Sequence, residues 1–129
     1  MESERFKRGV KKLRELDPKA PERMEEMLKD IAPDFFGYIA EFPYGEIYSR
    51  GVLSRKERQI ATIAALTALG NAQPQLQVHI KSAINIGFSR EEIIEIIMQM
   101  AVFAGFPAAL NGLLAAKQVF GKIDQENDS

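Results

Sequence analysis

The side chain most informative about chemistry is His79, the single histidine of a 129-residue chain that has no cysteine. A catalytic zinc site of the common three-ligand kind needs other donors, and a thiol-based redox centre needs cysteine. The chemistry that remains is proton transfer or binding by histidine, carboxylates and arginines. We therefore expect neither a metal nor a tightly held cofactor.

The position of His79 within its helix bears on its protonation. Residues 74–87 predict a helix with one apolar face, and at about 100° per residue His79 falls between Ala83 and Ile86 on its flank. Burial there disfavours the imidazolium, so the ring would stay neutral and exchange a proton near neutral pH. A histidine that only satisfies a backbone carbonyl is the alternative, and it stays open.

A second candidate group lies in residues 44–50, an aromatic and polar run that holds Glu46 and Arg50 four positions apart. If this run is helical, the two side chains share a face and could pair. A planar guanidinium suits carboxylates, which makes Arg50 a candidate for anion binding. A surface ion pair of little energetic weight is the competing interpretation.

Three aromatic residues complete the candidate set as substrate contacts: Tyr44, Tyr48 and Phe106. Phe106 precedes Pro107, where one predicted helix ends and the next begins. Free N–H groups at that helix start could bind an anion, although capping alone also explains the sequence.

The elements that must position these residues are almost all predicted helices. Residues 42–53 are the exception, because Pro43, Gly45 and Gly51 predict a loop with about one helical turn. Apolar periodicity and capping signals predict helices over residues 6–17, 24–32, 34–40, 54–70, 74–87, 90–105 and 107–121.

Two capping-box patterns, Ser54 with Glu57 and Ser89 with Glu92, lie 35 residues apart in the C-terminal half. This spacing predicts two tandem helical hairpins. A tetratricopeptide array has a similar period but needs more units and different aromatic anchors. We predict an all-α single domain, 1–129, a bundle of about six to seven helices. Its parts are N-terminal helices and a site loop (1–53), the hairpins (54–121) and a frayed tail (122–129).

Residues 90–104 form the most apolar predicted helix, with only Glu95 and Gln99 as a narrow polar strip. A helix that is apolar on nearly all sides must be buried on nearly all sides. We therefore predict an obligate homo-oligomer. A central helix within a monomeric bundle is the alternative.

Composition limits the partners. A net charge of −1 gives no long-range attraction to nucleic acid or to an anionic membrane. The charged N-terminus lacks the apolar run of a signal peptide, and no apolar stretch reaches the roughly 18 residues of a membrane span. We expect a cytoplasmic protein.

Several motifs in one order resemble the carboxymuconolactone decarboxylase family, most strongly over residues 41–120. The residues that carry the resemblance are 42–53 (FPYGEIYSRGVL), 76–79 with Ala83 and Gly87, 91–95 and 104–109.

The resemblance implies an all-helical, alkylhydroperoxidase D-like fold assembled as a ring-like homohexamer of dimers or trimers. It also implies a cofactor-independent lyase reaction, in which 4-carboxymuconolactone loses carbon dioxide and the resulting dienolate is protonated. By the same resemblance, Arg50 would bind a carboxylate or the developing enolate. His79 would deliver the proton, and Glu46 would orient or relay to it.

The related alkylhydroperoxidase D branch places a Cys-x-x-Cys pair upstream of its histidine. The corresponding positions here are about Ala72 and Gln75, and the relay glutamate falls near Gln59. Without cysteine, a thiol peroxidase mechanism is excluded. The remaining hypotheses are a decarboxylase acting on a small carboxylated lactone or acid, and a non-enzymatic helical oligomer that binds a small ligand or a partner.

Overall fold

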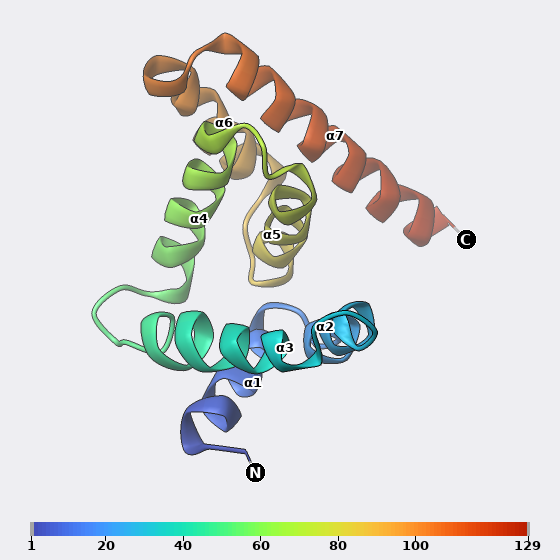
Figure 1. Ribbon diagram of the computed structural model, residues 1–129. Helices are drawn as coiled ribbons and strands as arrows, with labels where there is room; N and C mark the ends of the chain where they lie inside the picture. Colours follow the sequence, from blue (N-terminus) through green and yellow to red (C-terminus); the bar gives the residue numbers. More distant parts are fainter. Residues whose placement is uncertain (1, 129) are drawn as a thin grey trace. The chain divides into compact units, whose positions relative to one another are not determined.

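The computed structural model describes residues 2–128, which contain seven α-helices, one π-helix and no β-strand. This confirms the all-α class. The chain divides into two compact units, Met1–Arg55 and Lys56–Ser129, and Figure 1 labels their helices. Met1 and Ser129 lie outside the described residues, and the single domain over 1–129 stays a prediction.

Unit 1 is a set of short helices whose ends follow from local capping. The Ser3 side chain accepts a hydrogen bond from the Phe6 N–H at 3.0 Å, which starts the first helix. Pro33 lies in the first turn of the third helix, where its missing N–H costs nothing. The elements are α1 (Glu4–Leu16), α2 (Ala20–Leu28), α3 (Pro33–Ile39) and η1 (Ala40–Ile47).

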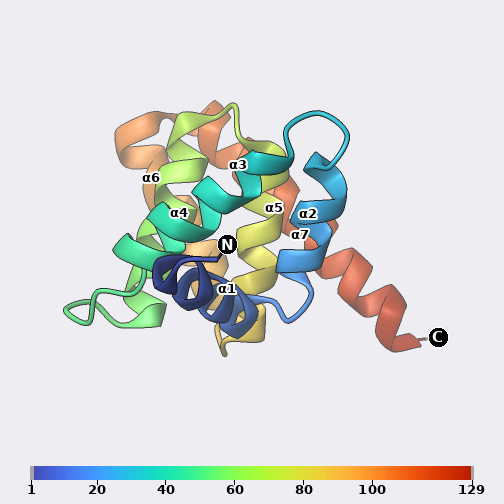
Figure 2. The same ribbon diagram turned by 60° about the horizontal axis from the view of Figure 1, so that its bottom comes forward.

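Two glycines allow α1 and η1 to pack backbone against backbone (Figure 2). A Cβ atom on Gly9 would lie 1.7 Å from the carbonyl oxygen of Ala40. One on Gly45 would lie 2.4 Å from the carbonyl oxygen of Arg5. Neither approach is sterically allowed for a larger residue, so this helix crossing requires glycine at both positions.

The prediction of a loop with about one helical turn over residues 42–53 is correct only in part: residues 48–53 are not helical, but η1 continues α3 as a helix to Ile47. Pro43 lies inside η1 and cannot donate a backbone hydrogen bond. The wider π-helical turn accommodates it: the Tyr48 N–H donates to the Pro43 carbonyl oxygen, five residues back, at 2.7 Å. Gly45, which favoured a loop in the sequence, instead allows the close approach of η1 to α1.

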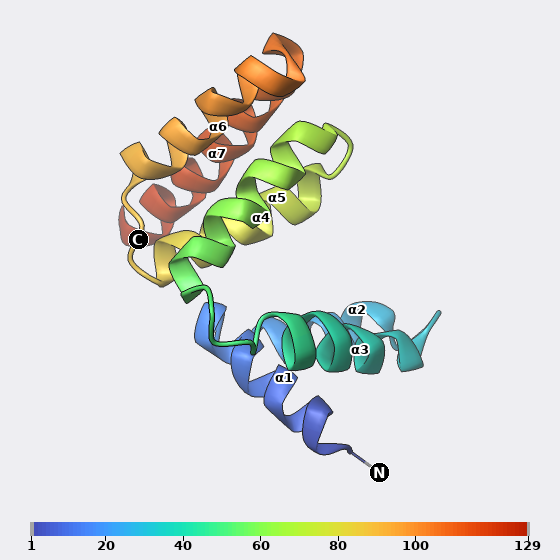
Figure 3. The same cartoon turned by 90° about the vertical axis from the view of Figure 1, so that its left-hand side faces the viewer.

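Unit 2 consists of two antiparallel hairpins, as the 35-residue spacing predicts (Figure 3). Gly70 and Gly105 end equivalent helices with φ of 76° and 95°. The second capping box is present: the Glu92 N–H donates to Ser89 Oγ, and the Ser89 N–H donates to Glu92 Oε1. The helices are α4 (Arg55–Leu69), α5 (Gln73–Asn85), α6 (Arg90–Ala104) and α7 (Phe106–Asp128).

Gly112 of α7 is buried in the core of unit 2, close to side chains of two other helices. A Cβ atom there would lie 2.8 Å from Ile97 Cγ2 on α6 and 2.9 Å from Thr67 Cγ2 on α4. Each fully buried aliphatic side chain contributes about 1.5–3 kcal/mol. The leucine and isoleucine side chains of unit 2 with no exposed surface are Ile63, Leu76, Ile80, Ile93 and Ile97.

Helix α7 is longer than predicted. It does not end near Gly121, and residues 122–128 of the predicted frayed tail are helical. Contacts with α6 account for the difference, because the Arg90 guanidinium donates to both carboxylate oxygens of Asp124, at 3.2 and 2.6 Å. The same guanidinium lies 4.9 Å from the ring centroid of Phe120.

Helix α6 is not buried on all sides within its own chain. Val102 is 75% exposed and Phe103 is 84% exposed. The homo-oligomer inferred from the apolar character of this helix therefore stays a prediction. In residues 2–128, no helix combines the length and apolar content needed to cross a bilayer.

Candidate functional site

His79 lies on α5, half-buried, against the fully buried side chain of Gln59 on α4. The Gln59 Nε2 atom donates to the His79 carbonyl oxygen at 2.8 Å and lies 3.1 Å from His79 Nδ1. Burial lowers the pKa of His79 to about 4. The direction of the shift agrees with the expectation from the sequence, and a ring with this pKa is neutral at pH 7.

The faces of α4 and α5 explain this placement. On α5, Leu76, Ile80 and Ala83 are fully buried, which turns His79 to the edge of the apolar stripe as predicted. On α4, the buried Gln59 lies one turn before Ile63, on the same inward face. In the sequence, Gln59 stands near the position of the relay glutamate of the related branch. Its helical register with Ile63 is the signal that could have identified it as buried.

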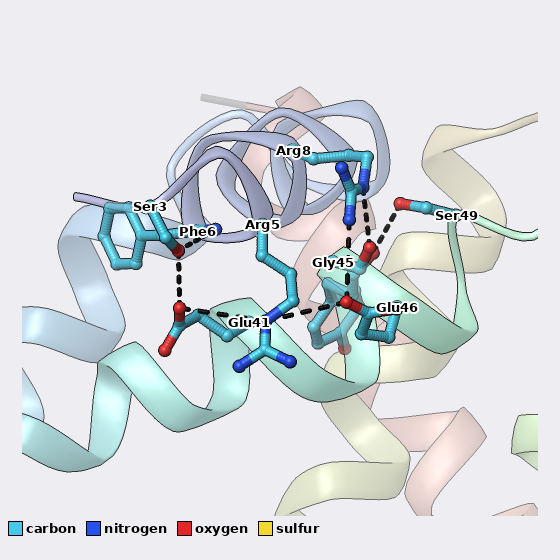
Figure 4. A network of polar contacts seen from close by, with 9 residues as sticks. Ser3, Arg5, Phe6, Arg8, Glu41, Gly45, Glu46 and Ser49 are labelled. Atoms are coloured by element: carbon cyan, nitrogen blue, oxygen red, sulfur yellow. Dashed lines mark hydrogen bonds and ion pairs between the residues drawn. The ribbon is translucent and has the colours of Figure 1, made fainter.

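Glu46 is held by arginines of α1 (Figure 4). Its Oε1 atom lies 3.6 Å from Arg5 Nε and 3.6 Å from Arg8 Nη2. The Arg8 Nε–H also donates to the carbonyl oxygen of Gly45 at 2.8 Å, and Arg5 lies 3.8 Å from Glu41. The side chains are roughly half exposed, so each pair contributes little to stability.

Arg50 lies beyond the end of η1. The helix ends at Ile47, and Arg50 is an exposed residue after a turn at residues 48–49. The condition for a shared helical face of Glu46 and Arg50 is therefore not met, because the helix does not reach Arg50. The guanidinium of Arg50 stays a candidate for anion binding.

Tyr44 and Tyr48 lie together in unit 1. Their rings stack with centroids 4.9 Å apart, and the Ser49 hydroxyl donates to the Tyr44 carbonyl oxygen at 2.6 Å. Tyr44 is only 7% exposed, and burial, with a smaller contribution from Tyr48, raises its pKa. The half-buried Tyr48 is thus the more accessible of the two predicted contacts.

Phe106 begins α7 and is 81% exposed. With Met98 and Leu110 it lines an apolar hollow of about 520 Å³ along α6 and α7. His79 is not among the residues that line this hollow. The structure therefore gives Phe106 an apolar setting in unit 2, different from that of His79.

The predicted site residues fall in both units. Tyr44, Glu46, Tyr48 and Arg50 belong to unit 1, whereas His79 and Phe106 belong to unit 2. No single unit contains all six residues, so a site shared by them stays a prediction. In the part of the chain that is described, no three His, Asp or Glu side chains group as potential metal ligands.

Comparisons with known proteins identify a family and three relatives of this chain. The model of the carboxymuconolactone decarboxylase family matches residues 33–118. A 4-carboxymuconolactone decarboxylase of Acinetobacter baylyi is 35% identical over 92% of this chain and 89% of its own length. An uncharacterised 15.0 kDa protein of Paracoccus denitrificans is 35% identical over 80% of this chain and 75% of its own. A nitrosuccinic acid decarboxylase of Metarhizium robertsii is 27% identical over 66% of this chain and 59% of its own.

Proposed function

The chain belongs to the carboxymuconolactone decarboxylase family, and we propose that it is a carboxy-lyase that releases carbon dioxide from a small carboxylated lactone or acid. The two relatives that carry the name of an activity are both decarboxylases, which supports a decarboxylase-like function. The particular substrate and the roles of individual residues are our proposals.

The substrates named for these relatives suggest a substrate class. In 4-carboxymuconolactone, the electron pair of the broken C–C bond can delocalise into an unsaturated lactone. In nitrosuccinic acid, the acceptor for such a pair is a nitro group. We propose that this protein takes a carboxylate whose carbon is joined to such an acceptor, because the substrate then supplies its own electron sink. The protein must only bind the anion and stabilise the charge that develops.

The observation that carries the proposal is the half-buried, neutral imidazole of His79 beside the buried amide of Gln59. In the proposed reaction Arg50 binds a substrate carboxylate, and His79 acts at the oxygen where negative charge develops. By the resemblance, Glu46 orients or relays to His79. Tyr44, Tyr48 and Phe106 contribute substrate contacts.

Carbon dioxide release from 4-carboxymuconolactone tests the function, with nitrosuccinic acid as a second substrate. The wild type should release carbon dioxide from at least one of them. His79→Gln should reduce kcat/KM by about 100-fold or more, as expected when a group that acts in the transition state is lost.

Lys122→Gln serves as a matched control, since Lys122 is an exposed residue of α7. Its activity should equal that of the wild type. If His79→Gln is as active as this control, His79 has no role in the reaction and the proposed site is wrong.

We also propose that the protein works as a homo-oligomer, a hexamer by the family resemblance, in which another copy covers the exposed apolar end of α6. Val102 and Phe103 are the side chains that such an interface would bury. Native mass spectrometry should show an oligomer for the wild type and for Glu95→Gln, a conservative change on the same helix. Val102→Asp should shift the protein to monomer, whereas a monomeric wild type would contradict the proposal.

A further inference from the structure

The amide of Gln59 makes two contacts with His79 that together determine which ring nitrogen of the imidazole carries the proton. Its Nε2 atom lies 2.8 Å from the His79 carbonyl oxygen and 3.1 Å from Nδ1. A backbone carbonyl can only accept a hydrogen bond, so the atom facing it must be the amide nitrogen and not the amide oxygen. The second hydrogen of this NH₂ group is then available to Nδ1.

An Nδ1 atom that accepts a hydrogen bond carries no proton of its own. We propose that Gln59 holds His79 as the neutral Nε2–H tautomer, so that His79 acts on the substrate as a hydrogen-bond donor and not as an imidazolium acid. Gln59 is thus a positioning residue. Its effect on catalysis rests on the proposed function, whereas the tautomer itself does not.

The same contacts oppose the imidazolium. Protonation of Nδ1 would set its N–H against the N–H of Gln59. Rotating the amide to relieve this would bring Gln59 Oε1 against the His79 carbonyl oxygen, and both are acceptors. Gln59 is fully buried, so water cannot easily compensate for either arrangement. Burial, and no neighbouring charge, is the cause of the lowered pKa of His79.

The neutral tautomer specifies what His79 does in the proposed reaction. The C–C bond to the carboxylate breaks, its electron pair moves onto the acceptor oxygen, and carbon dioxide leaves. The His79 Nε2–H donates a hydrogen bond to that oxygen and stabilises its charge. The imidazole keeps its proton, because losing it would leave an imidazolate. A water molecule supplies the proton to carbon, and the hydroxide left behind combines with the released carbon dioxide to give bicarbonate.

Nitrogen-15 NMR of protein labelled at histidine tests the tautomer directly, because the chain has one histidine and gives one imidazole signal set. Two-bond and three-bond couplings should identify Nε2–H and an unprotonated Nδ1 in the wild type at pH 7. An Nδ1–H tautomer in the wild type would overturn the proposal without any variant.

Variants of α4 separate positioning from packing. Gln59→Glu replaces the donor by an acceptor, so Nδ1–H should become the protonated nitrogen and the pKa of His79 should rise. Thr67→Val is the matched control, since Thr67 is also a buried polar residue of α4. It should leave the wild-type tautomer and pKa unchanged. If Gln59→Glu keeps the wild-type tautomer, Gln59 does not set it and the inference fails.

The pH profile of decarboxylation tests the catalytic consequence. A neutral donor predicts that kcat/KM is constant from pH 8 to about pH 5, because His79 stays uncharged and keeps its Nε2–H over this range. An imidazolium acid predicts instead that activity rises as the pH falls, and that result would overturn the donor role. The two proposals can fail separately. Suppose that the wild type has the Nε2–H tautomer, that Gln59→Glu loses it, and that the wild type decarboxylates neither substrate. The proposed function is then wrong, whereas the tautomer assignment is correct.

Discussion

The two units use polar groups in opposite ways. In unit 1, Arg5, Arg8 and Glu46 form ion pairs on a half-exposed surface above a crossing of two backbones. In unit 2, Gln59 and His79 form a neutral pair within the packed helices. Exposed charges are solvated and screened whether or not they are paired. A buried neutral group that loses its hydrogen-bond partner has no water to replace that partner.

The two units therefore differ in which residues determine the packing and which determine the chemistry. The packing of unit 1 depends on the absence of side chains at Gly9 and Gly45, and its charges add little. The packing of unit 2 fixes the protonation of one imidazole. We therefore expect the change in the free energy of unfolding to be largest for a substitution at the backbone contact. It should be smaller for one at the buried imidazole, and smallest for one at the surface ion pairs.

The largest effect is expected for Gly9→Ala. The new methyl group would lie 1.7 Å from the Ala40 carbonyl oxygen, so α1 and η1 must move apart. The free energy of unfolding should fall by about 3 kcal/mol or more, as for severe overpacking. Urea unfolding followed by circular dichroism measures the change.

Substitutions at two further glycines serve as comparisons for Gly9→Ala. Gly37→Ala meets no atom within 4 Å and should stabilise α3 by up to about 1 kcal/mol. In unit 2, the new methyl group of Gly112→Ala meets side-chain atoms of Ile97 and Thr67 and no backbone atom, so the loss of stability should be smaller than for Gly9→Ala. Equal losses at Gly9 and Gly112 would contradict the contrast between backbone and side-chain packing.

Sequence alone predicted unit 2 better than unit 1, and the reason is physical. Helices over residues 54–105 follow from apolar periodicity, a capping box and terminal glycines, which are all local signals. The helix η1 depends on a partner. Pro43 and Gly45 are residues that usually interrupt a helix, and the role of Gly45 becomes clear only from its packing against α1. The long α7 likewise depends on Arg90, which is distant in sequence.

The second prediction concerns the pH dependence of stability. The pKa of His79 is lowered from 6.5 to about 4 on folding, so the unfolded chain binds more protons between these values. Stability from this residue is present above pH 6.5 and is lost as the pH falls toward 4, by about 3 kcal/mol in all. The free energy of unfolding should therefore fall more steeply between pH 7.5 and 4 in the wild type than in His79→Gln.

The carboxylates titrate in both proteins, so the difference between the two curves isolates His79. Urea unfolding at several pH values provides these curves. Parallel curves would mean that His79 has an ordinary pKa in the folded protein. The buried pair would then be more hydrated than its contacts with Gln59 indicate.

The candidate site was only partly predictable for a related reason. The single His79 stood out by its type, and its place on the flank of a stripe follows from helical geometry. Gln59 did not stand out, since glutamine is usually exposed and its burial depends on the packing of α4 against other helices. For Glu46, spacing suggested Arg50 as a partner, whereas the fold supplies Arg5 and Arg8.

The smallest effect is expected for Glu46→Gln. The carboxylate is 42% exposed and both of its arginine partners are 49% exposed, so water screens the two pairs. The free energy of unfolding should fall by less than about 1 kcal/mol in 0.1 M NaCl, and the difference should nearly vanish in 1 M NaCl. Urea unfolding of both proteins at the two salt concentrations measures it. A loss above about 2 kcal/mol that persists in high salt would show that Glu46 is desolvated. The distinction between a screened surface network and a buried neutral pair would then no longer hold.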